Sequence, residues 1–364
     1  MNLAGSPTGE RRPDLDVTRA LALVGVCVMN YYGYMVLRGA DRRTDFLGRV
    51  FDPWRGPLST RFAATFVMVA GMGVALLARR TTGDDAETGR VRWVLVRRGV
   101  LLFTFGYFFN WVWPGTILLY YGALFLIAAA LFTLHDRWLI GIGVVAAVAA
   151  AGLRWWTLDR TTSGLTNDWA TRPDAGVTTS PWDLLVDVGA RGTHPLLPWL
   201  LFFCIGIVVG RRLPLDGVAR SRLAFTGVLC AAGGYLLRGV LPWAAELRSV
   251  APYDRSILYS LTTLGVAMTA VALVGAVAEA TSTNRVTRML AVAGRNTLTL
   301  YVLHALVFLL LVDRLEWIPA DGLTTALLFS AGYWVVAVAA ANLWAARVGT
   351  GPLEWVYRRF SDGH

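Results

Sequence analysis

The chain has 364 residues, of which 55% are hydrophobic and 16% are charged, and its formal net charge is +10. This composition argues against a soluble helical bundle, because the helices of such a bundle carry charged outer faces. The positive charge does not indicate a nucleic-acid partner, because its distribution follows the rule that basic residues gather on the cytoplasmic side of a membrane protein.

Ten uncharged apolar runs recur along the sequence, and a membrane-spanning helix needs about 17 to 25 such residues, with flanking arginines able to extend the shorter runs. We therefore predict an all-α, polytopic integral membrane bundle of about ten transmembrane helices in the plasma membrane, with the lipid bilayer as a partner. The runs cover residues 20–37, 62–78, 99–113, 116–134, 138–153, 196–210, 223–237, 257–278, 296–312 and 322–346.

Arginine supplies all 34 basic residues. With ten spans, placing both termini in the cytoplasm gives the cytoplasmic segments an excess of arginine over acidic residues, whereas the opposite side is nearly balanced. The sequence then divides into a cytoplasmic tail over residues 1–13, one transmembrane domain over 14–350 and a cytoplasmic tail over 351–364. Two long external loops, 38–61 and 154–194, are candidate walls of an external pocket.

Polar residues mark both ends of the first span. Asp16 and Arg19 are three residues apart at its start and can pair, which lowers the cost of an arginine at the membrane edge. Asn30 lies near its external end, where a carboxamide can both donate and accept hydrogen bonds. We expect Asn30 in a catalytic role and Asp16 and Arg19 in substrate binding.

His304 lies about halfway along the apolar run 296–312. The membrane interior penalises an ionisable residue by roughly 2 kcal/mol or more, so a histidine at this depth is a functional-site hypothesis. Thr297 and Tyr301 share its helix face at the i, i+4, i+7 spacing. We expect His304 to serve as a general base, with Asn30 or Tyr301 donating to an oxyanion. The structural alternative is an interhelical hydrogen bond.

His194 is a second candidate for the base. It lies at the external mouth of the span 196–210, and Pro195 favours an extended backbone just before that span. The alternative for this residue is a solvent-exposed loop position. The sequence holds no pair of histidines at the i, i+4 spacing of a metal site, so no metal is expected.

Five stretches, in this order, resemble motifs of one membrane family. They are Leu15-Asp16-x-x-Arg19 followed by Asn30; the glycine-bearing stretch 62–76; His194-Pro195-Leu196-Leu197-Pro198-Trp199 closing at Gly210-Arg211; Gly294-Arg295 through His304; and Gly351-Pro352-Leu353-Glu354-Trp355. Together they resemble the transmembrane acyltransferases related to heparan-α-glucosaminide N-acetyltransferase. They are still more similar to the bacterial YeiB-like family, which is named for a domain of unknown function.

The resemblance implies transfer of an acyl group, such as acetyl, from cytoplasmic acyl-CoA to a sugar hydroxyl or amine of an envelope glycan or metabolite outside. In the eukaryotic relatives the asparagine that ends the first span and a histidine shortly after it belong to the active site. Asn30 matches that asparagine, whereas the loop 38–61 contains no histidine.

An acyl-CoA donor also needs cationic contacts for its phosphates, and guanidinium groups suit phosphate oxygens. Arg97, Arg98 and Arg211 stand at expected cytoplasmic helix ends and are the candidates for this role. Arg295 and Thr297 are further candidates for substrate binding.

Two other functions fit the same residues. A transporter or permease would use His304, Asp16 and Arg19 as a polar pathway through the membrane. A non-catalytic membrane partner would need none of them. The acceptor, the acyl chain and a possible homo-oligomer are left open by the sequence.

Overall fold

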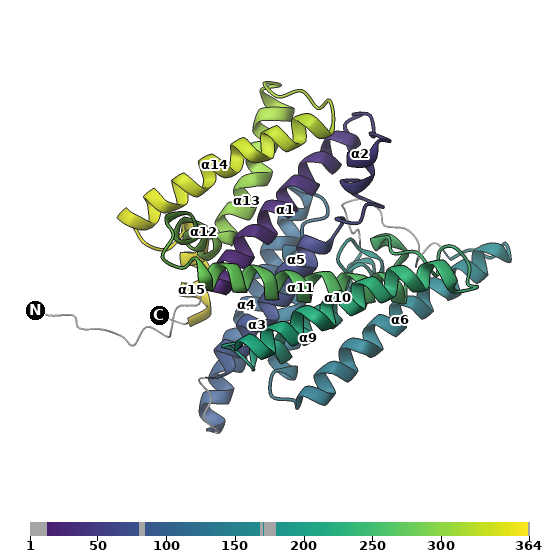
Figure 1. The fold of residues 1–364 in the computed structure, drawn as a ribbon, viewed down its shortest axis with the longest axis horizontal. Coiled ribbons are helices and arrows are strands. Elements are labelled where there is room, and N and C mark those ends of the chain that lie inside the picture. Colours follow the sequence, from purple (N-terminus) through teal and green to yellow (C-terminus); the bar gives the residue numbers. More distant parts are fainter. Residues whose placement is uncertain (1–12, 80–83, 168–169, 171–179, 363–364) are drawn as a thin grey trace, which may run out of the picture.

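The computed structural model describes residues 13–79, 84–167, 170 and 180–362. Within these ranges every regular element is helical, which confirms the all-α class (Figure 1). The elements are α1 (Pro13–Leu37), α2 (Phe46–Val50), α3 (Arg61–Ala78), α4 (Asp85–Val112), α5 (Leu118–Leu131), α6 (Asp136–Thr162), α8 (Pro181–Val186), η1 (Asp187–Arg191), α9 (Leu196–Gly210), α10 (Gly217–Val240), η2 (Pro252–Asp254), α11 (Ile257–Ala280), α12 (Arg285–Arg295), α13 (Thr297–Phe308), η3 (Leu309–Arg314), α14 (Leu323–Arg347) and α15 (Pro352–Asp362).

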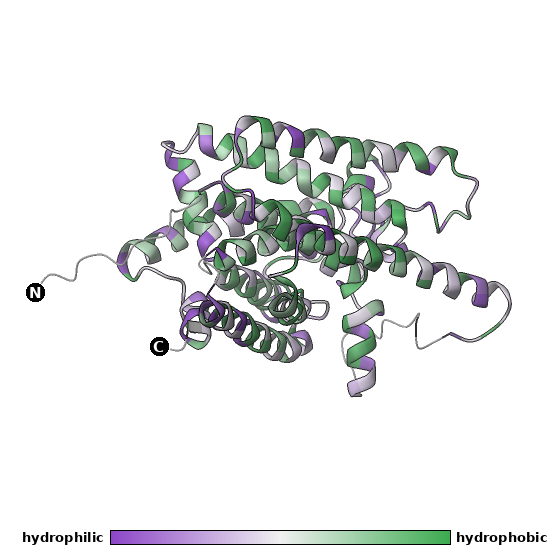
Figure 2. Cartoon of the chain, turned by 90° about the horizontal axis from the view of Figure 1, so that it is seen from below, coloured by the Kyte–Doolittle hydropathy of each residue, from purple (hydrophilic) through white to green (hydrophobic). Residues whose placement is uncertain are grey.

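Each apolar run falls on a helix, but not every helix is long and apolar enough to cross a bilayer. Seven in the described residues are, and the bent pair formed by Pro181–Arg191 and Leu196–Gly210 would make eight. Two expected spans fall short for physical reasons. Helix α4 carries four arginines in its first half, and α5 has 14 residues, roughly 21 Å at 1.5 Å per residue, against a hydrocarbon layer of about 30 Å. Figure 2 shows that apolar residues run along the long helices, with hydrophilic residues gathered mainly towards helix ends.

The expected loops and tails contain helices. The loop 38–61 includes α2, whose N-cap Asp45 accepts a hydrogen bond from the Gly48 N–H. This bond and the Arg43 guanidinium hold the pKa of Asp45 below its usual range. In the loop 154–194, α6 continues to Thr162, α8 and η1 follow later, and 168–169 and 171–179 lie outside the described residues. The tail 351–364 forms α15, whereas 1–12 of the expected N-terminal tail is outside the described part.

Helix α1 is the centre of the bundle and packs against α3, α11, α12, α13 and α14. Helices α3 and α9 meet backbone to backbone beside it. A Cβ atom at Gly206 would lie 2.1 Å from the Met68 carbonyl oxygen, and one at Gly71 would lie 2.2 Å from that of Phe203. Only glycine fits at these two positions, so the pair is held at the short separation that small residues permit in membranes.

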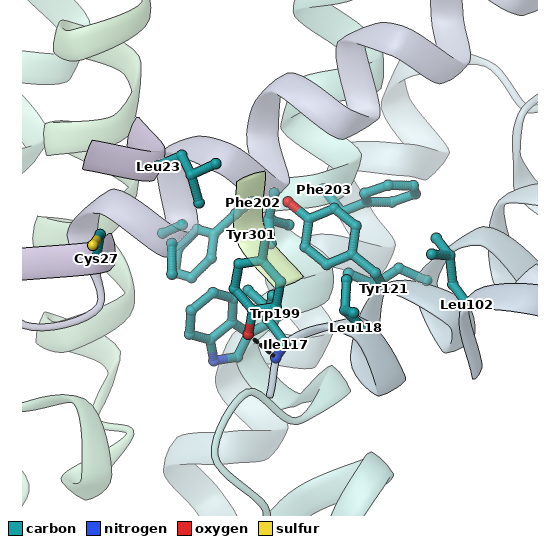
Figure 3. Packing of buried hydrophobic residues seen from close by; sticks show 14 of the residues in the cluster. Leu23, Cys27, Leu102, Ile117, Leu118, Tyr121, Trp199, Phe202, Phe203 and Tyr301 are labelled. Carbon is teal, nitrogen blue, oxygen red and sulfur yellow. Dashed lines mark hydrogen bonds between the residues drawn. The ribbon is translucent and has the colours of Figure 1, made fainter. Parts of the chain in front are cut away.

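Aromatic rings from several helices pack together inside the bundle. Figure 3 shows Trp199, Phe202 and Phe203 from α9 gathered with Tyr121 from α5 and Tyr301 from α13. All five residues are at most 6% exposed. Their packing fixes the relative positions of α5, α9 and α13, the last of which carries Tyr301 and His304.

Candidate functional site

A cavity of about 690 Å³ opens between the C-terminal half of α1, the segment 53–63, the α4–α5 turn and the stretch from α8 to His194. Its polar lining includes Asn30, Ser59, Thr60, Asn110, Thr193 and His194. The volume lies within the range of about 300 to 1,000 Å³ that is usual for small-molecule sites. The cavity therefore brings together three of the candidate residues, Asn30, His194 and Tyr301.

Asn30 is held in place by His304, which comes from α13. The Nδ2 atom of Asn30 lies 3.0 Å from Nε2 of His304, and Nδ1 of His304 is hydrogen-bonded to the Tyr301 carbonyl. A carbonyl oxygen can only accept, so Nδ1 carries the proton and Nε2 presents a lone pair. Asn30 must therefore donate one N–H to the imidazole, and its second N–H and its Oδ1 have no protein partner among the described residues.

His304 does not line the cavity. Its side chain is fully buried, and its ring packs near Tyr31, Trp113 and Tyr301 with centroid separations of 6.0, 5.5 and 4.9 Å. Tyr31 also donates from its hydroxyl to the His304 carbonyl at 2.9 Å. The imidazole thus stands behind Asn30, and its Nε2 atom faces the Asn30 amide and not the cavity.

His194 does line the cavity, from the break between η1 and α9. Its ring stands edge to face against Trp199 and Tyr120, with centroid separations of 4.7 and 5.7 Å. Its Nδ1 atom is buried and has no hydrogen-bond partner among the described residues. The nitrogen that remains accessible to a ligand is therefore Nε2.

Arg255 clamps the backbone that leads to His194. Its guanidinium donates to the carbonyls of Ala190, Arg191 and Gly192, the last two at 2.7 and 2.6 Å. The Tyr120 hydroxyl accepts from the Thr193 N–H at 3.0 Å. Burial lowers the pKa of Arg255, but arginine stays charged in proteins and keeps its five donors.

Sequence reasoning missed Arg255, because an arginine just before an apolar run looks like any other arginine that sets topology. Its left-handed backbone conformation, with φ of +47°, becomes visible only in the structure.

Tyr301 contributes a connection between α13 and α5. Its hydroxyl lies 3.1 Å from the Thr116 hydroxyl and accepts a hydrogen bond from the Ile117 N–H, also at 3.1 Å; Figure 3 marks the second bond. Tyr301 lines the cavity, but these two partners already engage its oxygen. Thr297, one turn earlier on the same helix, is half-buried and does not line the cavity.

The other candidates for substrate binding lie towards the opposite end of α1. Asp16 and Arg19 form the expected pair at 3.4 Å. Arg19 precedes Asn30 by roughly 16 Å along the helix, at 1.5 Å per residue, and neither Asp16 nor Arg19 lines the cavity. Arg295 is exposed at the end of α12. The structure thus separates these residues from the cavity.

The three arginines expected to hold phosphates have different surroundings. Arg211 pairs with Asp136 at 2.7 Å and donates to the Phe132 carbonyl at 2.7 Å, which joins the end of α9 to the start of α6. Arg97 stacks over Trp93 and Arg98 over Tyr357, with 5.5 and 5.2 Å to the ring centroids. In the part of the chain that the structure describes, no cluster of three or more His, Cys, Asp or Glu residues could hold a metal ion.

Two comparisons with known proteins bear on the family of the chain. No curated protein matches the chain. A family model matches residues 216–364, a region that contains Arg255, His304 and α15 but neither Asn30 nor His194. The family is described as "Protein of unknown function (DUF418)", and this match supports the DUF418, or YeiB-like, family for the chain.

Proposed function

We propose that this protein is a transmembrane acyltransferase that moves an acyl group from a thioester donor to a hydroxyl or amine held in the cavity. One observation carries the proposal. The cavity is lined both by an amide whose orientation a buried imidazole fixes, at Asn30, and by an imidazole with an accessible nitrogen, at His194. Acyl transfer requires a donor to an oxyanion and a base for the nucleophile.

The reaction can be written on these groups. As the acceptor oxygen forms its bond to the acyl carbon, His194 takes the acceptor proton on Nε2. The oxyanion accepts a hydrogen bond from the second N–H of Asn30, which His304 holds in one orientation. The carbon–sulfur bond then breaks, and the imidazolium returns its proton to the departing thiolate. The products are an ester and a thiol, or an amide and a thiol when the acceptor is an amine.

The donor in this proposal is acyl-CoA, which approaches from the end of the bundle that carries Arg19 and Arg98. These two arginines, with Arg97 and Arg295, are the cations proposed to meet its phosphates. Arg211 is less suited, because both terminal nitrogens of its guanidinium are engaged at 2.7 Å, by Asp136 and by the Phe132 carbonyl, whereas Arg19 makes one longer contact, at 3.4 Å, with Asp16. We place this end in the cytoplasm, in line with the positive-inside rule.

The cavity favours an uncharged acceptor. Its two charged lining side chains are already paired within the protein, Arg38 with Asp313 and Asp187 with Arg191. Aromatic rings such as Tyr34 and Trp54 also line it. Polar groups on an aromatic wall suit a neutral sugar better than a phosphorylated or acidic one.

The test uses purified protein in sealed proteoliposomes, with radiolabelled acetyl-CoA on one side and glucosamine or N-acetylglucosamine on the other. We expect labelled sugar to form with the native chain and to fall by at least about 100-fold in His194→Ala, the scale of general-base catalysis. His135→Ala is the matched control, because His135 is exposed at the start of α6.

Three results would count against the enzyme. One is unchanged transfer by His194→Ala, and another is the absence of acetyl-CoA binding by the stable, folded protein. The third is passage of sugar across the vesicle without any acetylated product, which would favour the transporter.

A further inference from the structure

The C-terminal helix α15 presents apolar side chains to the outside of the protein. Trp355 is 55% exposed, Val356 45% and Phe360 47%. At 3.6 residues per turn these three lie on one arc of the helix with Arg359 between them, whereas Glu354 on the other side is buried. An ordinary surface helix turns its polar side outward, so the polarity of α15 is inverted.

Two arginines lie on or beside the exposed arc. Arg359 is on it and Arg358 flanks it, both are exposed, and the Arg359 guanidinium stands 5.5 Å from the centroid of the Trp355 ring. Tryptophan prefers the level of lipid headgroups, and an arginine beside it can lay its stem along the apolar surface while its charge stays in the headgroup layer. The side chains on this arc therefore suit contact with the surface of a membrane.

We propose that α15 is a membrane-surface helix that binds anionic phospholipid headgroups. Its apolar arc buries into the boundary between headgroups and acyl chains, and its two exposed arginines attract anionic lipid phosphates. A second copy of the chain is a poorer occupant, because two such arcs would bring arginine against arginine. Charge complementarity therefore selects the anionic lipid.

The buried side of α15 ties this helix to the one that carries His304. The Glu354 carboxylate accepts hydrogen bonds from the Leu298 N–H at 2.6 Å, the Thr299 N–H at 3.0 Å and the Thr299 hydroxyl at 2.5 Å. A helix leaves the N–H groups of its first turn without internal partners. Glu354 satisfies two of them for α13. In this proposal, the position of α15 on the bilayer therefore influences the start of α13.

The test is hydrogen–deuterium exchange of the full chain in nanodiscs of phosphatidylcholine alone and of phosphatidylcholine with phosphatidylglycerol in equal amounts. We expect the amides of α15, and those at the start of α13, to exchange several-fold more slowly in the anionic discs. The double variant Arg358→Gln/Arg359→Gln should remove the difference. Both side chains are exposed, so the variant is expected to fold.

Two further variants sharpen the test. Arg285→Gln/Arg288→Gln removes the same charge from exposed positions on α12 and should leave the response of α15 to phosphatidylglycerol intact. Glu354→Gln should keep that response in α15 while weakening it in α13. The proposal is overturned if α15 exchanges equally in both lipids, if the α12 variant abolishes the difference as fully, or if protection rises with protein concentration, which would indicate a second copy.

Discussion

The Nε2 atom of His304 lies 3.0 Å from the Nδ2 atom of Asn30, although the two residues are 274 positions apart in the sequence. Asn30→Ala leaves the buried imidazole of His304 without its partner, which costs about 1 to 3 kcal/mol of unfolding free energy, and His304→Ala removes the partner of the half-buried Asn30 amide. The double variant Asn30→Ala/His304→Ala removes both groups at once. We expect it to be more stable than the sum of the single losses predicts, by about 1 kcal/mol or more.

This double-mutant cycle is measured by chemical denaturation in one detergent. Strict additivity of the two single variants would show that the contact contributes no coupling energy, and His304 would then not hold Asn30.

Two buried tyrosines of the core differ in whether their hydroxyls have hydrogen-bond partners. The Tyr301 hydroxyl meets Thr116 and Ile117, whereas the buried Tyr121 hydroxyl has no hydrogen-bond partner among the described residues. We expect Tyr301→Phe to cost about 1 to 2 kcal/mol, because it orphans the Ile117 N–H. Tyr121→Phe should be neutral or stabilising. Thermal unfolding of both variants side by side checks this, and equal losses would contradict it.

The α3–α9 contact allows a similar comparison between glycines. In Gly206→Ala the new methyl group meets the Met68 backbone, so the helices must separate and Tm should fall by several degrees. In Gly233→Ala on α10 the methyl group meets nothing within 4 Å, and alanine is the better helix former by about 1 kcal/mol in water. We expect Tm of that variant to stay or rise. A fall of the same size in both variants would refute the steric argument.

Arg255→Lys tests the clamp on the His194 loop. A lysine keeps the charge but lacks the fork that reaches the carbonyls of Ala190, Arg191 and Gly192 together. We expect faster hydrogen exchange in the segment 190–194 and weaker ligand binding in the cavity, with little change at α15. Arg248→Lys, also in the α10–α11 connection and half-buried, is the control. Unchanged exchange at 190–194 would remove Arg255 from the site.

The sequence was sufficient to place the helices and to single out Asn30, His194 and His304, because apolar runs and buried polar residues are local signals. It could not show that Asn30 and His304 pair, since nothing local joins residues from the first and last parts of the chain. Nor could it show that His304 stands behind the cavity wall while His194 lines it. The pairing of Asn30 with His304 depends on how α1 and α13 pack against each other, and the position of His194 depends on the break between η1 and α9.

The number of membrane spans could not be predicted from hydropathy alone. Hydropathy alone counted 99–113 and 116–134 as full spans. In the structure the first is the end of the longer helix α4, and the second holds α5, too short to cross the hydrocarbon layer by itself. Helix lengths and breaks are set by turns such as the one at Trp113-Pro114-Gly115, whose geometry the hydropathy profile does not contain.

The glycine contact between α3 and α9 limits how the cavity can change its shape. Because backbone meets backbone at Gly71 and Gly206, there is no layer of side chains that could change rotamers and let the two helices slide. The wall that Phe62 provides at the start of α3 is therefore fixed relative to α9. Widening of the cavity for a larger ligand must come from its other walls, namely the end of α1, the α4–α5 turn and the segment that carries His194.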